Sequence, residues 1–314
     1  MMDWFTYIIY SAMWSIIRWL PEQAAYGFFQ QLANLAYKRN GKRVQRLRSN
    51  YQRVKPNLSP VELEEMVKAG LTSAMRYWCD TFRIQDWSQE EAASTVTSTN
   101  QHLLAEGMRS GKGVIVAVPH AGNWDHAGYY YCAIGYPVHT VAEHLRPDRL
   151  FRKFLAHRQR MGMTVLDLDS KTLPELKKFL YQGQLVALVA DRDLSKSGIE
   201  VDFFGGVAKM PVGPALLAYQ TEASLITAYV NYRDDGIHIS WDGPIQVARE
   251  NEERVEVARI TQEIAKVFEK EIQNDPTSWH MQQRIFVDDG SFVDRKSTRL
   301  NSSHEWISRM PSSA

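Results

Sequence analysis

The feature that most constrains the fold of this chain is a short apolar run, residues 113–118, that ends abruptly in a polar cluster, residues 119–126. The run is rich in β-branched residues and indicates a buried strand, and the polar cluster is typical of a turn that leads into a helix. In open α/β sheets, ligands bind beyond the carboxyl ends of the strands. The sequence therefore places His120 and Asp125 where a substrate would bind.

Similar apolar runs recur along the chain and alternate with stretches of helical periodicity. The predicted strands are residues 136–143, 164–168, 185–190, 225–230 and 237–241. This alternation predicts an α/β fold with a mostly parallel central sheet flanked by helices. An apolar content of 44% excludes a disordered chain. We find no internal repeat and no glycine-rich phosphate loop, and we expect a single domain over residues 1–295.

The N-terminal segment is apolar and rich in aromatic residues. Only 14 uncharged residues separate Asp3 from Arg18, whereas a membrane-spanning helix needs about 20 apolar residues. Tryptophan and tyrosine favour the boundary between membrane and water. We therefore expect membrane-associating helices in residues 1–40 that lie in the interface; the alternative is helices that simply pack on the domain.

A cluster of basic residues follows this segment. Residues 38–55 contain eight lysines and arginines and no acid. Such a cluster beside an apolar helix attracts anionic lipid headgroups. A nucleic-acid partner is the alternative, as is a solvated helix face without a function, but the net charge of +1 argues against a nucleic-acid-binding protein. The expected partner is the surface of an anionic membrane.

The last residues, 296–314, break the pattern of the rest of the chain. They are polar, rich in serine and without periodicity, and they resemble translated vector or adapter sequence. We expect this segment to be a disordered, non-native tail.

The residue types in the polar cluster suggest acid–base chemistry. If His120 ends the strand and Asp125 lies in the first turn of the next helix, the carboxylate can orient the imidazole and leave one ring nitrogen as a base. No Gly-x-Ser-x-Gly motif occurs, and no cysteine lies near the cluster. A base without a protein nucleophile suggests that a substrate hydroxyl attacks, as in direct acyl transfer to an alcohol. The alternative is a structural histidine at the end of a strand.

Other interpretations remain open from the residues alone. His120, Asp125 and His126 are also possible ligands of a metal in a hydrolase. The only other candidate cluster, residues 191–193, follows a predicted strand and is equally suited to a network of charges at the same edge of the sheet. A third alternative is a lipid-binding protein without catalytic activity.

The stretch Pro-His-Ala-Gly-Asn-Trp-Asp, residues 119–125, resembles the His-x4-Asp/Glu motif of the glycerolipid acyltransferase superfamily. Its Gly-Asn-Trp is typical of the branch that contains the bacterial lipid A late acyltransferases. Residues 143–162 and 190–214 are similar to the same branch, and the resemblance covers roughly residues 1 to 290. Two departures, Asp125 in place of Glu and Arg192 in place of Gln, are closer to the enzymes that acylate phosphatidylinositol mannosides.

The resemblance implies an enzyme that moves a fatty acyl group, typically palmitoyl, from acyl-CoA to a mannose hydroxyl of a phosphatidylinositol mannoside. It implies direct transfer at the cytoplasmic face of the plasma membrane by a peripheral or monotopic protein. His120 would be the general base and Asp125 its orienting partner. Acyl-CoA would be a co-substrate, and no metal or other cofactor is implied. A lipid A-type or lysophospholipid acyltransferase is the alternative.

The same resemblance implies six further residues near the substrates. Glu143 and Arg158 match family positions near the cleft and are assigned to site architecture and to donor or acceptor contacts. The others are expected near a polar headgroup or a sugar. In chain order the six residues are Glu143, Arg158, Asp191, Arg192, Asp193 and Glu200.

Overall fold

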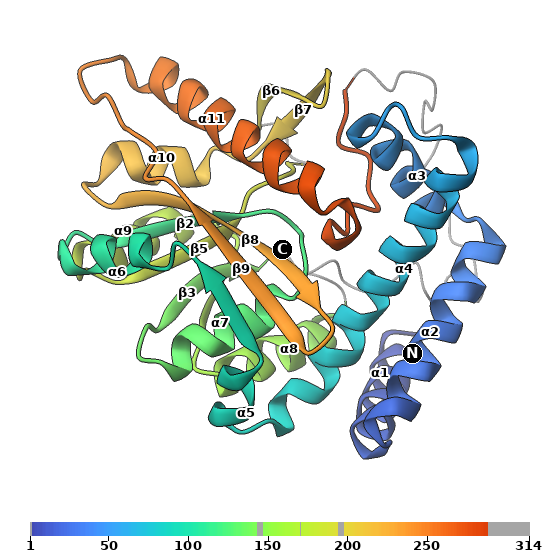
Figure 1. The fold of residues 1–314 in the computed structure, drawn as a ribbon. Coiled ribbons are helices and arrows are strands. Elements are labelled where there is room, and N and C mark those ends of the chain that lie inside the picture. Colours follow the sequence, from blue (N-terminus) through green and yellow to red (C-terminus); the bar gives the residue numbers. More distant parts are fainter. Residues whose placement is uncertain (1, 143–146, 170, 194–197, 288–314) are drawn as a thin grey trace.

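A seven-stranded sheet forms the centre of the molecule in the computed structural model, which describes residues 2–142, 147–169, 171–193 and 198–287 (Figure 1). The strand order is β1-β9-β8-β2-β5-β3-β4, and every neighbouring pair is parallel except β8 and β9. This confirms the predicted α/β fold with a mostly parallel sheet. The strands are β1 (Val96–Thr99), β2 (Val114–Val118), β3 (Val138–Ala142), β4 (Thr164–Asp167), β5 (Leu185–Val189), β8 (Ser224–Arg233) and β9 (Gly236–Asp242).

Strand β2 lies in the middle of this sheet, with β5 and β8 as its parallel neighbours. Val114 and Val116 pack into one buried cluster, whereas Ile115 and Ala117 pack into the other. A central parallel strand is covered on both faces, which explains why the run is apolar throughout instead of alternating. The first residues after β2 therefore emerge at the centre of the carboxyl edge.

Helices cover both faces of the sheet. One buried cluster joins it to α6 (His102–Arg109), α7 (Trp124–Ala133) and α8 (Asp148–Arg160). The other cluster joins it to α9 (Thr172–Tyr181), α10 (Gly213–Gln220) and α11 (Glu253–Asn274). Figure 1 shows α10 and α11 on one side of the sheet and α7 and α8 on the other. Both core layers end close to the residues that follow β2.

The N-terminal part of the chain is helical, as predicted. Helices α1 (Met2–Trp19), α2 (Glu22–Arg39) and α3 (Lys42–Val54) pack against α4 (Pro60–Arg83) and lie at one side of the sheet (Figure 1). Helix α4 begins with a reciprocal cap in which Ser59 and Glu62 each bond the other's backbone N–H. Among the helices of the described residues, none has the length and apolar character needed to cross a bilayer.

Two parts of the fold differ from the sequence prediction. The polar stretch before residue 100 contains a helix, α5 (Gln89–Ser94), and the edge strand β1. A polar edge strand carries little hydrophobic signal, and its partner β9 lies far along the chain. A second, two-stranded sheet, β6 (Ile199–Phe203) and β7 (Gly206–Met210), was also not predicted. Short 3-10 turns follow α4 and α11, namely η1 (Ile84–Asp86) and η2 (Pro276–Ser278).

Candidate active site

His120 lies immediately beyond β2, and its imidazole is held by an acid from the neighbouring strand. Nδ1 of His120 lies 2.5 Å from Oδ1 of Asp191, and the backbone N–H of His120 donates to Oδ2 of the same carboxylate at 3.0 Å. Asp191 follows β5, which pairs in parallel with β2, so both residues emerge at the same edge of the sheet. Asp191 is fully buried. The sheet therefore builds a His–Asp pair from two separate segments.

The charge on Asp191 is stabilised by its partners. Burial by itself raises the pKa of this carboxyl, but His120 and the indole N–H of Trp279, which donates to Oδ2 at 2.8 Å, outweigh it and hold the pKa below its usual value. With Nδ1 engaged by Asp191, the second ring nitrogen of His120 is left over. Nε2 is buried and makes no hydrogen bond to any described residue. An imidazole oriented in this way is suited to act as a general base through Nε2.

The prediction that Asp125 orients His120 is wrong. The Asp125 carboxylate accepts hydrogen bonds from Nε of Arg158 at 2.7 Å and from the hydroxyl of Tyr77 at 2.8 Å. Asp125 lies in the first turn of α7, where the side chain turns towards α8 and α4. Asp125 is the acid closer to His120 along the chain. The pairing of β2 with β5 instead brings Asp191, 71 positions away in sequence, into contact with His120.

Arg158 and Asp125 form a buried ion pair beneath the motif. Arg158 is 6% exposed and Asp125 is 2% exposed. Burial disfavours the charged guanidinium, but the Asp125 carboxylate more than compensates, and the pKa of Arg158 lies above its ordinary value. The hydroxyl of Tyr77 completes the coordination of the carboxylate. This arrangement ties α4, α7 and α8 together next to His120.

A small pocket of about 70 Å³ adjoins His120. Its wall combines aromatic rings, two arginines from distant parts of the chain and polar groups from the segment after α11. Arg192 contacts the side-chain amide of Gln283 on this wall, and Arg43 belongs to the basic helix α3. The residues that line the pocket are Arg43, Ala74, Tyr77, Trp78, His120, Trp124, Arg192, His280, Met281, Gln282 and Gln283.

A second cavity, almost entirely apolar and about 70 Å³ in volume, lies between the sheet and α7. Trp124 lines both this cavity and the pocket at His120, so the two spaces adjoin at that residue. Asp125 and Arg158 form the polar end of the cavity. The apolar lining includes Val116, Val118, Ala127, Gly128, Tyr131, Val138, Met163, Leu185, Ala228, Val230, Ile239 and Trp241. An oriented imidazole in a pocket of aromatic rings and arginines that adjoins an apolar cavity is suited to chemistry on a lipid-like substrate.

Comparison with known sequences agrees with this geometry. The sequence profile of the bacterial lipid A biosynthesis acyltransferases matches residues 1–287. The chain belongs to this family. It is 34% identical over 297 residues to the phosphatidylinositol mannoside acyltransferase of Mycolicibacterium smegmatis, covering 93% of this chain and 94% of the relative. It is also 34% identical over 303 residues to the protein of the same name from Mycobacterium tuberculosis, covering 95% and 92%.

The Asp-Arg-Asp stretch of this acyltransferase is divided among three tasks. Asp191 holds His120, Arg192 lines the pocket, and the backbone N–H of Asp193 donates to the carbonyl of Lys209 on β7. Glu200 on β6 is exposed, lies 3.8 Å from the Lys209 ammonium, and is not among the residues that line the pocket at His120. Glu143 and the tail at residues 296–314 lie outside the described residues.

The geometry does not assemble the metal site considered from the sequence. His120 faces Asp191, Asp125 faces Arg158, and Nε2 of His126 donates to the carbonyl of Ala92 at 3.0 Å. Burial lowers the pKa of His126 to about 4, so this imidazole is neutral. Among the described residues, no three His, Cys, Asp or Glu side chains lie close enough together to hold a metal ion.

The sequence analysis missed three residues of the site: Tyr77, Trp279 and His280. Tyr77 lies on α4, and the other two lie in the segment after α11. Nε2 of His280 lies 2.8 Å from the hydroxyl of Ser73, and burial lowers the pKa of this histidine to about 3. An adjacent Trp-His pair in an otherwise polar stretch was the only signal in the sequence.

Proposed function

We propose that this chain transfers a fatty acyl group from acyl-CoA to a mannose hydroxyl of a phosphatidylinositol mannoside, with His120 as the general base. The observation that carries the proposal is the buried His120–Asp191 pair, whose Nε2 has no partner among the described residues, beside an apolar cavity. The family and the names of the relatives support acyl transfer and this class of acceptor.

The proposed reaction needs no acyl-enzyme. Nε2 of His120 takes the proton of the acceptor hydroxyl, and the oxygen attacks the thioester carbonyl of acyl-CoA. The C–S bond then breaks, and the imidazolium returns its proton to the leaving thiolate, which gives an ester and free CoA. Asp191 stabilises the imidazolium while it exists. Among the described residues that line the pocket there is no serine, threonine or cysteine, which agrees with direct transfer.

The apolar cavity supports a fatty acyl donor. A chain that enters beside Trp124 would pass from the pocket at His120 into apolar surroundings and would leave its carbonyl near His120. Burial of methylene groups is favourable by about 0.8 kcal/mol each, so an apolar lining favours an alkyl chain over a polar group. Arg43 and Arg192 line the pocket at His120. Their guanidinium groups are suited to bind phosphate, which both acyl-CoA and the proposed acceptor carry.

The first test offers the purified protein a mixture of labelled acyl-CoAs together with phosphatidylinositol mannosides, lipid A precursors or lysophospholipids in separate reactions. We expect CoA release with the mannosides, at a rate at least about tenfold above that with the other acceptors, and a product heavier by one acyl group. Mass spectrometry of the product identifies the acylated sugar. Preferential acylation of a lipid A precursor or a lysophospholipid would contradict the proposed acceptor but not the acyltransferase chemistry.

We also propose that the enzyme works at the inner surface of the plasma membrane, bound through α1 and the basic helix α3. Helix α1 buries Trp14 and Ile17 against the rest of the protein and turns a row of large apolar side chains outward. Trp19 is 90% exposed. The exposed row consists of Trp4, Ile8, Ile16 and Trp19, and the exposed basic residues nearby in the chain are Lys38, Arg39, Lys42 and Arg46. This combination favours the interface of an anionic membrane.

Replacing both exposed tryptophans of α1 (Trp4→Ser with Trp19→Ser) should weaken binding to vesicles that contain phosphatidylglycerol by about tenfold or more, since each buried aromatic ring contributes roughly 1.5–3 kcal/mol. Co-sedimentation at low and high salt measures the effect. Val255→Ser, an exposed apolar residue on α11, is the matched control and should bind like the parent. Unchanged binding of the double variant would contradict the proposed docking surface.

A further inference from the structure

The segment that follows η2 runs beside the residues that follow β2. Ala121 and Trp279 form an antiparallel bridge. The backbone N–H of Gly122 donates to the carbonyl of Ser278, and the backbone N–H of His280 donates to the carbonyl of His120, both at 2.8 Å. This segment therefore fixes the backbone of the motif on both sides of Ala121, although more than 150 residues separate the two segments in sequence.

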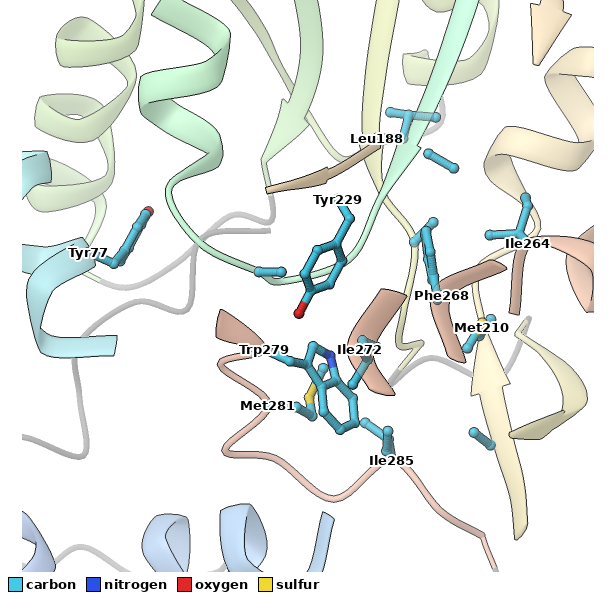
Figure 2. Packing of buried hydrophobic residues seen from close by; sticks show 14 of the residues in the cluster. Tyr77, Leu188, Met210, Tyr229, Ile264, Phe268, Ile272, Trp279, Met281 and Ile285 are labelled. Atoms are coloured by element: carbon cyan, nitrogen blue, oxygen red, sulfur yellow. The ribbon is translucent and has the colours of Figure 1, made fainter. Parts of the chain in front are cut away.

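The side chain of Trp279 reaches from this segment into the core beside Asp191. It is fully buried, and Figure 2 shows it near Tyr229, Ile272 and Met281. Its indole N–H donates to Oδ2 of Asp191 at 2.8 Å, while Oδ1 of the same carboxylate faces Nδ1 of His120. Oδ2 also accepts the backbone N–H of His120, so two donors hold one oxygen and leave the other for the imidazole.

We propose that Trp279 is a positioning residue for acyl transfer, whose indole N–H fixes the Asp191 carboxylate in the orientation that His120 requires. The inference rests on the proposed function, because it assumes that His120 is the base. Trp279 does not line the pocket and is not expected to contact either substrate. Its effect on the reaction therefore passes through Asp191.

Asp191 is a buried carboxylate that is held by three hydrogen bonds, one of them from Trp279. A hydrogen bond to a charged group stabilises it more than a neutral hydrogen bond does, and it also restricts rotation of the group. Without the indole N–H, burial would raise the pKa of Asp191, and the carboxylate could turn away from Nδ1. A phenylalanine at this position would fill most of the same space but could not donate the hydrogen bond.

The position of Trp279 is itself held from the N-terminal helices. The hydroxyl of Tyr51 on α3 donates to the carbonyl of Trp279 at 3.1 Å, and the side-chain amide of Asn50 donates to the carbonyl of Met281 at 2.7 Å. Both anchoring residues are buried. Because these anchors bind the backbone, a change of the indole alone should leave the path of the segment intact.

The test compares Trp279→Phe with the parent in the acyl-CoA assay. We expect kcat to fall about tenfold, since a hydrogen bond to a charged group is lost, and KM for both substrates to change less than twofold. The acidic limb of the pH–kcat profile should move to higher pH, because a carboxylate that has lost this donor makes the coupled His120–Asp191 pair bind a proton more strongly. Trp14→Phe removes a buried indole hydrogen bond to the Phe82 carbonyl and should keep the parental kcat.

A double-variant cycle separates positioning from a general packing effect. In an Asp191→Asn background, Trp279→Phe should have no further effect on kcat if the indole acts through Asp191. An equal further loss in that background would overturn the proposal, as would a parental kcat and pH profile for Trp279→Phe in the parent background. Full activity of His120→Ala would instead overturn the proposed function.

A second variant guards against misfolding of Trp279→Phe. Replacing Trp279 with benzothienylalanine keeps the two-ring shape and exchanges only the N–H for sulfur. The same drop in kcat with unchanged thermal unfolding would support the inference. A parental kcat for this variant would overturn it, whatever the behaviour of Trp279→Phe.

Discussion

Asp191→Asn should lower kcat by roughly 10³- to 10⁴-fold, by analogy with the loss of the acid in a Ser-His-Asp triad. The asparagine side chain presents an N–H or a neutral oxygen to Nδ1 of His120, so the imidazole loses both its preferred tautomer and the charge that stabilises the imidazolium. Asp125 remains in place in this variant, yet it cannot substitute, because Arg158 and Tyr77 engage its carboxylate. KM should change by no more than a few-fold, since Asp191 is fully buried.

Steady-state rates of CoA release, with acyl-CoA and acceptor varied in turn, measure this effect. His120→Ala gives the reference for complete loss of the base, and Asp202→Asn, an exposed acid on β6, is a matched control that should keep the parental rate. Circular dichroism establishes that each variant is folded. A kcat of Asp191→Asn within about tenfold of the parent would show that His120 does not depend on this acid.

Arg158→Met should destabilise the fold by about 3–5 kcal/mol, because it leaves the buried Asp125 carboxylate without its cation. Among the described residues, the hydroxyl of Tyr77 is then the remaining hydrogen-bond donor to that carboxylate. Replacing both members, Arg158→Met with Asp125→Leu, should recover most of the loss, since an apolar pair of similar volume avoids the buried charge. The same double change should still impair activity, because both residues line the apolar cavity that adjoins the pocket at His120.

Urea denaturation gives the free energy of unfolding for each variant of this cycle. Lys178→Met is the matched control, because Lys178 and Glu175 form an exposed ion pair that contributes about 1 kcal/mol or less. If Arg158→Met were as stable as the parent, the buried pair would not carry the energy assigned to it. If the double variant were less stable than either single variant, removal of both charges would not restore stability, and the predicted recovery would be contradicted.

The sequence by itself determined the central strand, the sheet class and the position of His120 at the end of that strand. A run that is apolar on both faces fits only a covered strand, so residues 114–118 fixed the centre of the sheet and placed His120 at its carboxyl edge. The alternation of helices and strands was equally local in origin, and the structure confirms it. The polar edge strand β1 and the hairpin of β6 and β7 were not predicted. Pairing with a neighbouring strand stabilises them, and their own residues show little hydrophobic pattern.

Only the tertiary structure decided which acid contacts the imidazole of His120. Spacing along the chain favoured Asp125, whereas parallel pairing of β2 with β5 delivers Asp191 to Nδ1 of His120 and leaves Asp125 to Arg158. The indole of Trp279 enters the same site from a segment after α11. Side-chain periodicity indicates which face of each element is buried, but it does not indicate which elements become neighbours. That choice depends on strand order and packing, and it is where the charge network of this acyltransferase is set.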